Sequence, residues 1–238
     1  MINKDKGIII YLKKIKDNDL FLKILSKKDN IISGMVYGGN SSKKKSIYQI
    51  GHFVEYNIFL KNLNNPPSIK AEIIPPFTSN FLKDKFKSFS LLSTISLLNL
   101  SIIEGQKVNN LYLSIENLFN TIKLKKNWIV DYCEWLLYLL QMIGYQIDYR
   151  NNVDFKYYNL ETLNFEKEDY YNNNVIEFPH ELFAEGYKYK LTDIKIIFLI
   201  FEKIFQKNHL NNINSKMPIN FINFKELILK ELKSHLND

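Results

Sequence analysis

The sequence predicts an α+β protein in which a small β-barrel precedes an all-helical region. Residues 7–76 contain five short stretches rich in Ile, Val, Phe and Tyr, separated by turn residues. From residue 80 the apolar residues recur with a helical period. The charge also changes there: residues 1–79 carry 13 lysines against six acidic residues, whereas 19 basic and 19 acidic residues balance in residues 80–238. We therefore expect two domains, residues 1–79 and residues 80–238.

Five strands are expected in the first domain, at residues 7–16, 20–28, 30–39, 48–62 and 68–76. Short strands at this close spacing favour a closed or half-closed barrel. The turn between the third and fourth strands stands out, because "GGNSSKKKSIYQIG" at residues 38–51 combines flexible residues with three consecutive lysines.

Helices are expected in the second domain, at residues 80–103, 109–123, 127–144, 178–186, 192–210 and 218–236. The helix at 127–144 has almost no polar face, so it should run through the centre of the domain. Residues 150–177 are polar and weakly periodic. This pattern predicts an irregular insertion.

The sequence carries none of the common catalytic or metal-binding motifs. The histidines are far apart and have no Cys, His or carboxylate partner at ligand spacing: His52, His180, His209 and His235. The sequence lacks a GxSxG nucleophile elbow, a GxxxxGK phosphate-binding loop and GxGxxG. Neighbouring acids such as Glu166 and Glu168 fall in the polar insertion, where carboxylates lack the apolar surroundings that raise a pKa. We expect no enzyme, no metal and no cofactor.

The sequence also predicts a cytoplasmic protein. Its single cysteine, Cys133, lies in an apolar run, which suits a buried thiol in a reducing compartment. The first residues lack the features of a secretory signal. The most apolar segment, 128–144, is interrupted by Asp131 and Glu134 and is too short to span a membrane.

The basic turn predicts contact with a polyanion. Lysines on a loop beside the open face of a small barrel can follow a phosphate backbone without one fixed geometry. The candidate phosphate contacts are Lys43, Lys44 and Lys45 in the turn, and Lys13, Lys14, Lys16, Lys23, Lys27 and Lys28 on or next to the preceding strands, where alternation puts about half of them on the solvent face. Tyr37 and Tyr48, with Phe53 and Tyr56, are candidate rings for stacking unpaired bases. The alternative is that the lysines serve solubility and the rings fill the barrel.

The order of these features resembles the RecO family of bacterial DNA-repair proteins. The resemblance rests on Gly7-Ile8-Ile9, on "KDND" at 16–19, on "GMVYGGNSSKKKSIYQIG" at 34–51 and on "YCEWLLYLLQMIGYQIDY" at 132–149. The expected final helices are also similar in layout to those of the family. The likeness spans the whole chain, and the order and spacing of the motifs support it.

This resemblance implies a five-stranded oligonucleotide-binding (OB) barrel, a helical C-terminal domain and no catalytic activity. The implied function is to bind single- and double-stranded DNA, to anneal complementary strands and to help RecA replace single-strand-binding protein (SSB) at gaps. The implied partners are RecR, the acidic C-terminal tail of SSB and, indirectly, RecA, and the implied location is the bacterial nucleoid. Many relatives carry a four-cysteine zinc site, but residues 149–174 contain no cysteine. We therefore expect no zinc.

An acidic tail with an apolar end needs a hydrophobic pocket rimmed by cations. Lys195, Phe198, Lys203 and Phe205 on the helix at 192–210 offer this mixture, although a helix facing the core would look the same. Two rival function classes remain. An OB-type barrel also suits an RNA-binding or ribosome-associated protein. Docking on acidic lipid is disfavoured, because no helix is strongly amphipathic and rich in lysine with exposed Trp or Phe.

Overall fold

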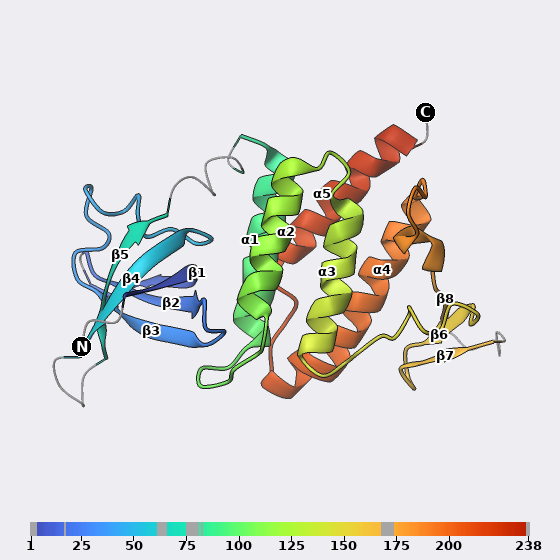
Figure 1. Ribbon diagram of the computed structural model, residues 1–238, viewed down its shortest axis with the longest axis horizontal. Helices are drawn as coiled ribbons and strands as arrows, with labels where there is room; N and C mark the ends of the chain where they lie inside the picture. Colours follow the sequence, from blue (N-terminus) through green and yellow to red (C-terminus); the bar gives the residue numbers. More distant parts are fainter. Residues whose placement is uncertain are drawn as a thin grey trace. The chain divides into compact units, whose positions relative to one another are not determined.

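A computed structural model of the protein describes residues 4–16, 18–60, 66–74, 81, 83–167 and 174–236. The chain forms two compact units, Met1–Phe119 and Asn120–Asp238 (Figure 1). The expected domain boundary at residues 79 and 80 lies outside the described residues. The division between the two compact units falls between Phe119 and Asn120, within the helix Leu111–Leu124.

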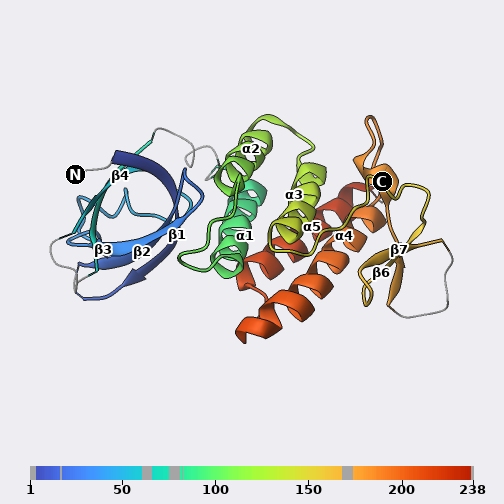
Figure 2. The ribbon, with the colours of Figure 1, turned by 60° about the horizontal axis from the view of Figure 1, so that its bottom comes forward.

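Five strands form the barrel of the first unit: β1 Lys4–Lys14, β2 Leu20–Ser26, β3 Ile31–Val36, β4 Phe53–Phe59 and β5 Ser68–Ile73. The barrel closes in the order β1-β2-β3-β5-β4, because β4 pairs with β1 (Figure 2). Only the β3–β5 pair is parallel among these neighbours. The closed five-stranded barrel confirms both the barrel that the strand spacing predicts and the OB fold that the resemblance implies.

The barrel core consists of the side chains that point inward from the strands. Because side chains alternate between the two faces of a strand, Leu20, Leu22 and Ile24 of β2 all point into the barrel. Val54 and Tyr56 of β4 meet them there and have no exposed surface. The alternation in the sequence therefore determines which face of each strand is buried inside.

The fourth strand begins at Phe53, later than the predicted residue 48. The preceding residues 37–52, which we call the lysine loop, consist almost entirely of turns. Gly51 ends the possible strand before Phe53, because its φ of +83° lies outside the β region. A side chain would not fit there either, since a Cβ would lie 2.5 Å from Cδ2 of Leu91. Tyr48 enters the barrel core, where its hydroxyl accepts a hydrogen bond from the Ala71 N–H at 3.1 Å.

The first unit also contains α1, Lys85–Ser101, and the part of α2, Leu111–Leu124, that extends to Phe119. Helix α1 starts later than the predicted residue 80, because Asp84 caps it and accepts hydrogen bonds from the N–H groups of Phe86 and Lys87 at 2.9 and 3.2 Å. Phe53 at the start of β4 packs edge-on against Tyr112 and Phe119 of α2, with ring centroids 6.1 and 6.2 Å apart.

The second unit is built on three helices, α3 Ile129–Met142, α4 Leu191–Ile204 and α5 Ile219–Leu236. Helix α4 continues into a π-helix, Phe205–Leu210, and a short 3-10 turn, Asn211–Ile213. The predicted burial of α3 is confirmed, since Tyr132, Cys133 and Leu136 have no exposed surface. The Tyr132 ring packs against Phe198 of α4 and Phe224 of α5, with centroids 6.3 and 4.7 Å apart.

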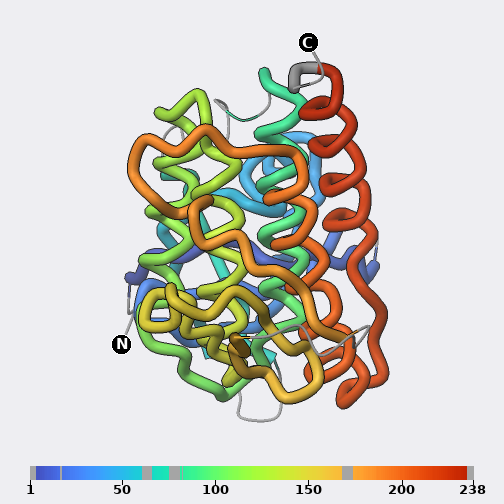
Figure 3. Tube along the Cα trace, turned by 90° about the vertical axis from the view of Figure 1, so that its right-hand side faces the viewer, coloured from blue at the N-terminus to red at the C-terminus, as the bar shows by residue number. Residues whose placement is uncertain are grey.

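A small sheet replaces the irregular insertion that the sequence predicts. Its strands are β6 Tyr157–Asn159, β7 Asn164–Glu166 and β8 Val175–Glu177, in the order β7-β6-β8 (Figure 1). Figure 3 shows the backbone trace of this segment in yellow. Each strand has three residues, too few for a periodicity to be visible in the sequence. The predicted helix at 178–186 is reduced to a 3-10 turn, His180–Phe183.

Aromatic rings hold this small sheet together. Phe178 packs against Tyr149, Tyr158 and Phe165, with ring centroids 5.7, 6.3 and 5.2 Å apart. The segment does not fit the four-cysteine zinc site of many relatives, because it contains no cysteine. In the described parts of the chain, no three His, Cys, Asp or Glu side chains lie close enough together to hold a metal ion. Nor does any described helix have the length and apolar character needed to cross a membrane.

Candidate nucleic-acid interface

One end of the barrel collects most of the predicted phosphate contacts. Residues 15, 16, 18 and 19 of the β1–β2 turn meet the lysine loop there. The N–H of Gly38 donates to the Asp19 carboxylate at 2.7 Å, and the N–H of Asn40 donates to the carbonyl of Asn18 at 2.8 Å. The exposed lysines on these two segments and on the adjoining end of β1 are Lys13, Lys14, Lys16, Lys43, Lys44 and Lys45. We call these six residues the lysine cluster.

The lysine loop is held by its own hydrogen bonds, whereas its glycines and serines suggested free movement. The N–H groups of Lys44 and Lys45 donate to the carbonyl of Ser41 at 3.0 and 2.9 Å. The N–H of Ile47 donates to the carbonyl of Lys44 at 2.9 Å. The His52 ring donates from Nδ1 to the Ile47 carbonyl at 3.0 Å. Backbone hydrogen bonds therefore hold the turn that carries the three lysines, which are exposed. The Lys44 ammonium also donates to the Tyr37 carbonyl at 3.5 Å.

Lys27 and Lys28 lie at the opposite end of the barrel. Strand register shows this, because β1 pairs Gly7 with Ser26 at one end and Lys14 with Leu20 at the other. The ammonium group of Lys28 lies 3.6 Å from the Asp5 carboxylate, which offsets part of its charge. These two lysines therefore form a separate and weaker cationic site.

Only one of the four candidate rings offers a face to solvent. Tyr37, next to the lysine cluster, is 55% exposed, whereas Tyr48 is 6% exposed, Phe53 is 4% exposed and Tyr56 is fully buried. Burial also raises the pKa of the Tyr48 phenol, which keeps its hydroxyl protonated beside the Ala71 N–H. Tyr48, Phe53 and Tyr56 thus pack in the interior and cannot stack bases. For these three rings the alternative holds that aromatic side chains fill the interior.

The outer face of β1, β2 and β3 carries two rings outside the predicted set, Tyr11 and Phe21. Tyr11 pairs with Lys23 across β1 and β2, and Lys13 pairs with Phe21. The rings of Tyr11 and Phe21 are half-buried with centroids 6.5 Å apart, and the Lys23 ammonium lies over the Tyr11 ring, 5.7 Å from its centroid. Alternation along β2 points to Phe21 and Lys23. In β1 the register shifts between Ile9 and Tyr11, so alternation from the buried Ile9 does not predict the outward position of Tyr11 and Lys13.

Of the four residues predicted to bind an acidic tail, two are buried in the core and two are exposed. Phe198 and Phe205 are 1% and 0% exposed and belong to the core of the second unit. Lys195 and Lys203 are exposed. The rings of Phe198 in α4 and Phe205 in the π-helix that follows both point into the core, so neither ring can line a surface pocket.

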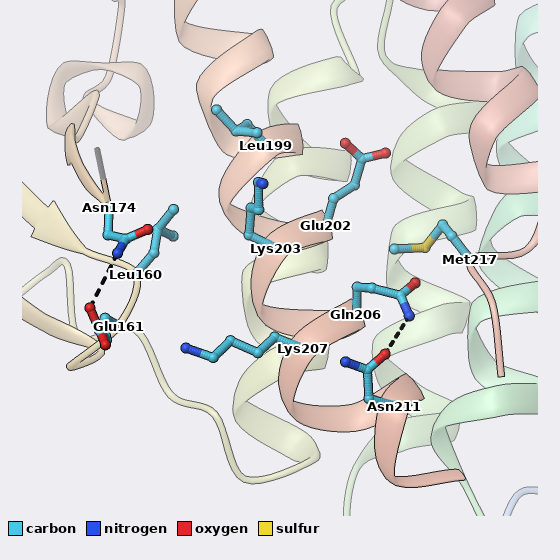
Figure 4. Close-up of a pocket in the computed structure, with 10 residues that line it drawn as sticks. All are labelled: Leu160, Glu161, Asn174, Leu199, Glu202, Lys203, Gln206, Lys207, Asn211 and Met217. Atoms are coloured by element: carbon cyan, nitrogen blue, oxygen red, sulfur yellow. Dashed lines mark hydrogen bonds between the residues drawn. The ribbon is translucent and has the colours of Figure 1, made fainter. Parts of the chain in front are cut away.

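A pocket of about 530 Å³ nevertheless lies beside Lys203 (Figure 4). Its lining residues come from α4, from the π-helix that follows it and from the small sheet: Leu160, Glu161, Asn174, Leu199, Glu202, Lys203, Gln206, Lys207, Asn211 and Met217. Lys207 extends across the pocket toward Leu160 and Glu161 in Figure 4. Lys195 is not part of the lining.

Most polar groups in this pocket already have partners within the protein. Glu202 accepts from the Lys225 ammonium at 2.6 Å, Asn174 donates to Glu161 at 3.2 Å, and Gln206 donates to Asn211 at 2.8 Å. Lys203 and Lys207 form no ion pair with any residue that the structure describes. The pocket therefore combines apolar walls with two cations available to a ligand.

Comparison with known proteins connects the barrel to DNA repair. Residues 1–77 match the protein family described as "Recombination protein O N terminal". The chain is 31% identical over 146 residues to "DNA repair protein RecO" of Rickettsia canadensis (strain McKiel), which covers 61% of this chain and 59% of that protein. It is 32% identical over 147 residues to the protein of the same name from Rickettsia akari (strain Hartford), with 61% and 60% covered. These matches confirm the resemblance to RecO and span about three fifths of the length of those relatives.

Proposed function

We propose that this chain, whose residues 1–77 carry the N-terminal domain of recombination protein O, is a non-catalytic DNA repair and recombination protein. In this proposal its OB barrel binds single- and double-stranded DNA. The observation that carries the proposal is the lysine cluster, six exposed lysines on segments that hydrogen bonds join at one end of the barrel. A cationic patch of this kind is what a phosphate backbone requires.

The physical basis of binding is neutralisation of phosphates by these lysines. Each neutralised phosphate releases condensed counterions, so affinity falls as salt rises. The hydrogen bonds within the lysine loop lower the entropy cost of binding, because less of its backbone has to become ordered. Two strands held on one cationic surface repel each other less, which favours annealing of complementary strands.

The partners proposed for this role are RecR, SSB and, indirectly, RecA. In this role the protein anneals strands and helps RecA to replace SSB at gaps, in the cytoplasm at the nucleoid. We place the acidic C-terminal tail of SSB in the pocket beside α4. The apolar walls from Leu160, Leu199 and Met217 suit the apolar end of such a tail, and Lys203 and Lys207 suit its carboxylates.

A salt titration of DNA binding tests the central claim. If about five phosphates are neutralised, the logarithm of the association constant should fall against the logarithm of salt concentration with a slope of about −3.5 for single strands. A slope near zero would refute binding through the lysine cluster. Competition between RNA and single-stranded DNA of equal length decides the alternative, because an RNA-binding or ribosome-associated protein would prefer RNA.

A strand-annealing assay with SSB-coated oligonucleotides tests the mediator role. The protein should speed annealing of complementary strands that carry SSB. If the protein binds DNA but does not speed the annealing of SSB-coated strands, the mediator role is refuted. DNA binding by the barrel would still stand.

A further inference from the structure

We propose that Asp19, an acidic residue beside the lysine cluster, is a positioning residue that holds the lysine loop ready for DNA. Its carboxylate anchors the backbone of the loop and does not neutralise a lysine. The inference rests on the proposed DNA binding and adds a residue that acts through the loop. It implies that an acidic side chain strengthens the binding of a polyanion at this end of the barrel.

The carboxylate of Asp19 is used by the loop backbone. One of its oxygens accepts a hydrogen bond from the N–H of Gly38 at 2.7 Å. Among the residues that the structure describes, no ion pair joins Asp19 to a lysine of the cluster. A carboxylate that accepts from a backbone N–H makes a shorter and stronger hydrogen bond than a neutral acceptor makes. Asp19 is therefore an anchor for Gly38.

The β1–β2 turn holds Asp19 itself in place. The N–H of Ile15 donates to the Asp19 carbonyl at 3.0 Å, and the N–H of Asp19 donates to the Lys16 carbonyl at 2.6 Å. These bonds use backbone atoms only, so the turn closes without the carboxylate. The next residue, Leu20, begins β2 and is buried. The Asp19 side chain thus extends from a held backbone and is available to a second segment.

Hydrogen bonds continue from Gly38 to the lysines. The Gly38 carbonyl accepts from the N–H and from Oγ of Ser41, at 3.2 and 2.7 Å. The Ser41 carbonyl is in turn the acceptor for the N–H groups of Lys44 and Lys45. Gly38 has a φ of +66°, which glycine adopts without strain but also leaves easily. The bond to Asp19 supplies the restraint that glycine itself lacks.

Charge and position predict opposite effects of removing this carboxylate. A negative charge near bound phosphates repels them, so its loss alone should tighten binding. Loss of the anchor should weaken binding, because a loosened loop has to be ordered again on DNA. Asp19→Ala removes both the charge and the anchor. Asp19→Asn removes the charge but keeps an oxygen that can accept the Gly38 N–H, so the two variants separate the two effects.

Amide hydrogen exchange of the free protein tests the anchor. In Asp19→Ala the amides of Gly38, Lys44 and Lys45 should exchange several-fold faster than in wild type, and in Asp19→Asn they should stay close to wild type. The matched control is Glu72→Ala. It removes an exposed acidic residue of β5 from the cross-strand row of Lys6, far along β1 from the lysine cluster, and should leave these amides unchanged. Unchanged exchange in Asp19→Ala overturns the anchor.

Titration of an oligothymidine strand and of a duplex tests the consequence for binding. Asp19→Ala should bind both about 3- to 10-fold more weakly, whereas Asp19→Asn should bind as tightly as wild type or about 2-fold more tightly. In a protein with Ala at Lys43, Lys44 and Lys45, Asp19→Ala should have no further effect, because a positioning residue acts only through the residues that it positions. Tighter binding by Asp19→Ala, or an equal loss with and without the three lysines, overturns the inference.

The outcomes separate this inference from the proposed function. A wild-type protein that binds neither DNA overturns the proposed function, whereas hydrogen exchange still decides whether Asp19 anchors the loop. The bond between the Asn40 N–H and the Asn18 carbonyl uses backbone atoms and survives the substitution, so Asp19→Ala should loosen the loop without unfolding the barrel. If this variant does not fold, the wild-type protein decides, because exchange of the Gly38 amide at the rate of an unfolded chain rejects the anchor.

Discussion

The carboxylate of Asp29 accepts a hydrogen bond from the backbone N–H of Tyr112 at 2.8 Å, which joins the β2–β3 turn to the first turn of α2. Its other oxygen accepts from the N–H of Asn110, also at 2.8 Å. Asn30 forms a β-bridge with Lys107 beside them. A turn residue of the barrel thus caps a helix far along the chain, so barrel and helix stabilise each other within one unit.

Asp29→Ala should lower the free energy of unfolding by about 1 kcal/mol, because the N–H of Tyr112 in α2 and that of Asn110 just before it lose their acceptor. The positive φ of Asp29, 62°, adds to the loss, since Asn and Asp tolerate this conformation better than Ala. Chemical denaturation measures the effect. Asp29→Asn keeps an acceptor and the tolerance for positive φ, so it should lose less; equal losses in both variants would contradict the capping role.

Changing Lys43, Lys44 and Lys45 together to Ala should weaken binding of single- and double-stranded DNA several-fold at low salt. The salt slope for single strands should become shallower by about 2, because three phosphate contacts are lost. Fluorescence anisotropy at several salt concentrations measures both quantities. Ala at Lys216, Lys230 and Lys233, which are exposed in the second unit, removes the same charge and should leave the slope intact. Unchanged affinity in the loop variant would remove the loop from the site.

The stability of the barrel should fall in mild acid through His52. Burial lowers the pKa of this histidine, whose Nδ1 donates to the Ile47 carbonyl in the lysine loop. The unfolded chain therefore binds the proton more readily than the folded chain. The free energy of unfolding should drop as the pH falls below about 6.5, the usual value for histidine. Denaturation of wild type and His52→Gln at neutral and mildly acidic pH checks this, and an equal drop in both would exclude His52 as the cause.

Tyr48→Phe should destabilise the barrel and leave DNA binding unchanged. Removing the hydroxyl leaves the Ala71 N–H without its acceptor, which costs about 1–3 kcal/mol for a buried group. Denaturation and DNA titration on the same sample separate the two effects. Weaker DNA binding by a variant that remains folded would contradict this prediction and restore Tyr48 as a DNA contact.

Replacing Lys203 and Lys207 by Ala should weaken binding of a labelled peptide copied from the SSB tail by about 3- to 10-fold, because two cations at the pocket rim are lost. A peptide titration measures the change. Lys230 and Lys233 on α5 lie outside the pocket lining, so Ala at these two positions should have no effect. Undiminished affinity in the first variant would move the tail to another surface.

Local sequence properties determined the fold class and the segregation of charge. Alternation in β2, the turn residues between strands and the helical period of residues 127–144 all act within a few residues of chain, so they can be recognised without tertiary structure. The same holds for Lys43, Lys44 and Lys45, whose exposure follows from their place in a polar turn. Short elements escape such analysis, as the three-residue strands β6, β7 and β8 show.

Tertiary structure alone decided which residues come together. Alternation tells which face of a strand a side chain occupies, but only the register pairs Tyr11 with Lys23 and places Lys27 at the opposite end of the barrel from Lys14. Tyr48 lies in a polar turn of the sequence, but its ring packs in the core of the closed barrel. Its hydroxyl accepts a hydrogen bond there from the Ala71 N–H. These are contacts between segments distant in the chain, and the energy that selects them arises only when the segments pack.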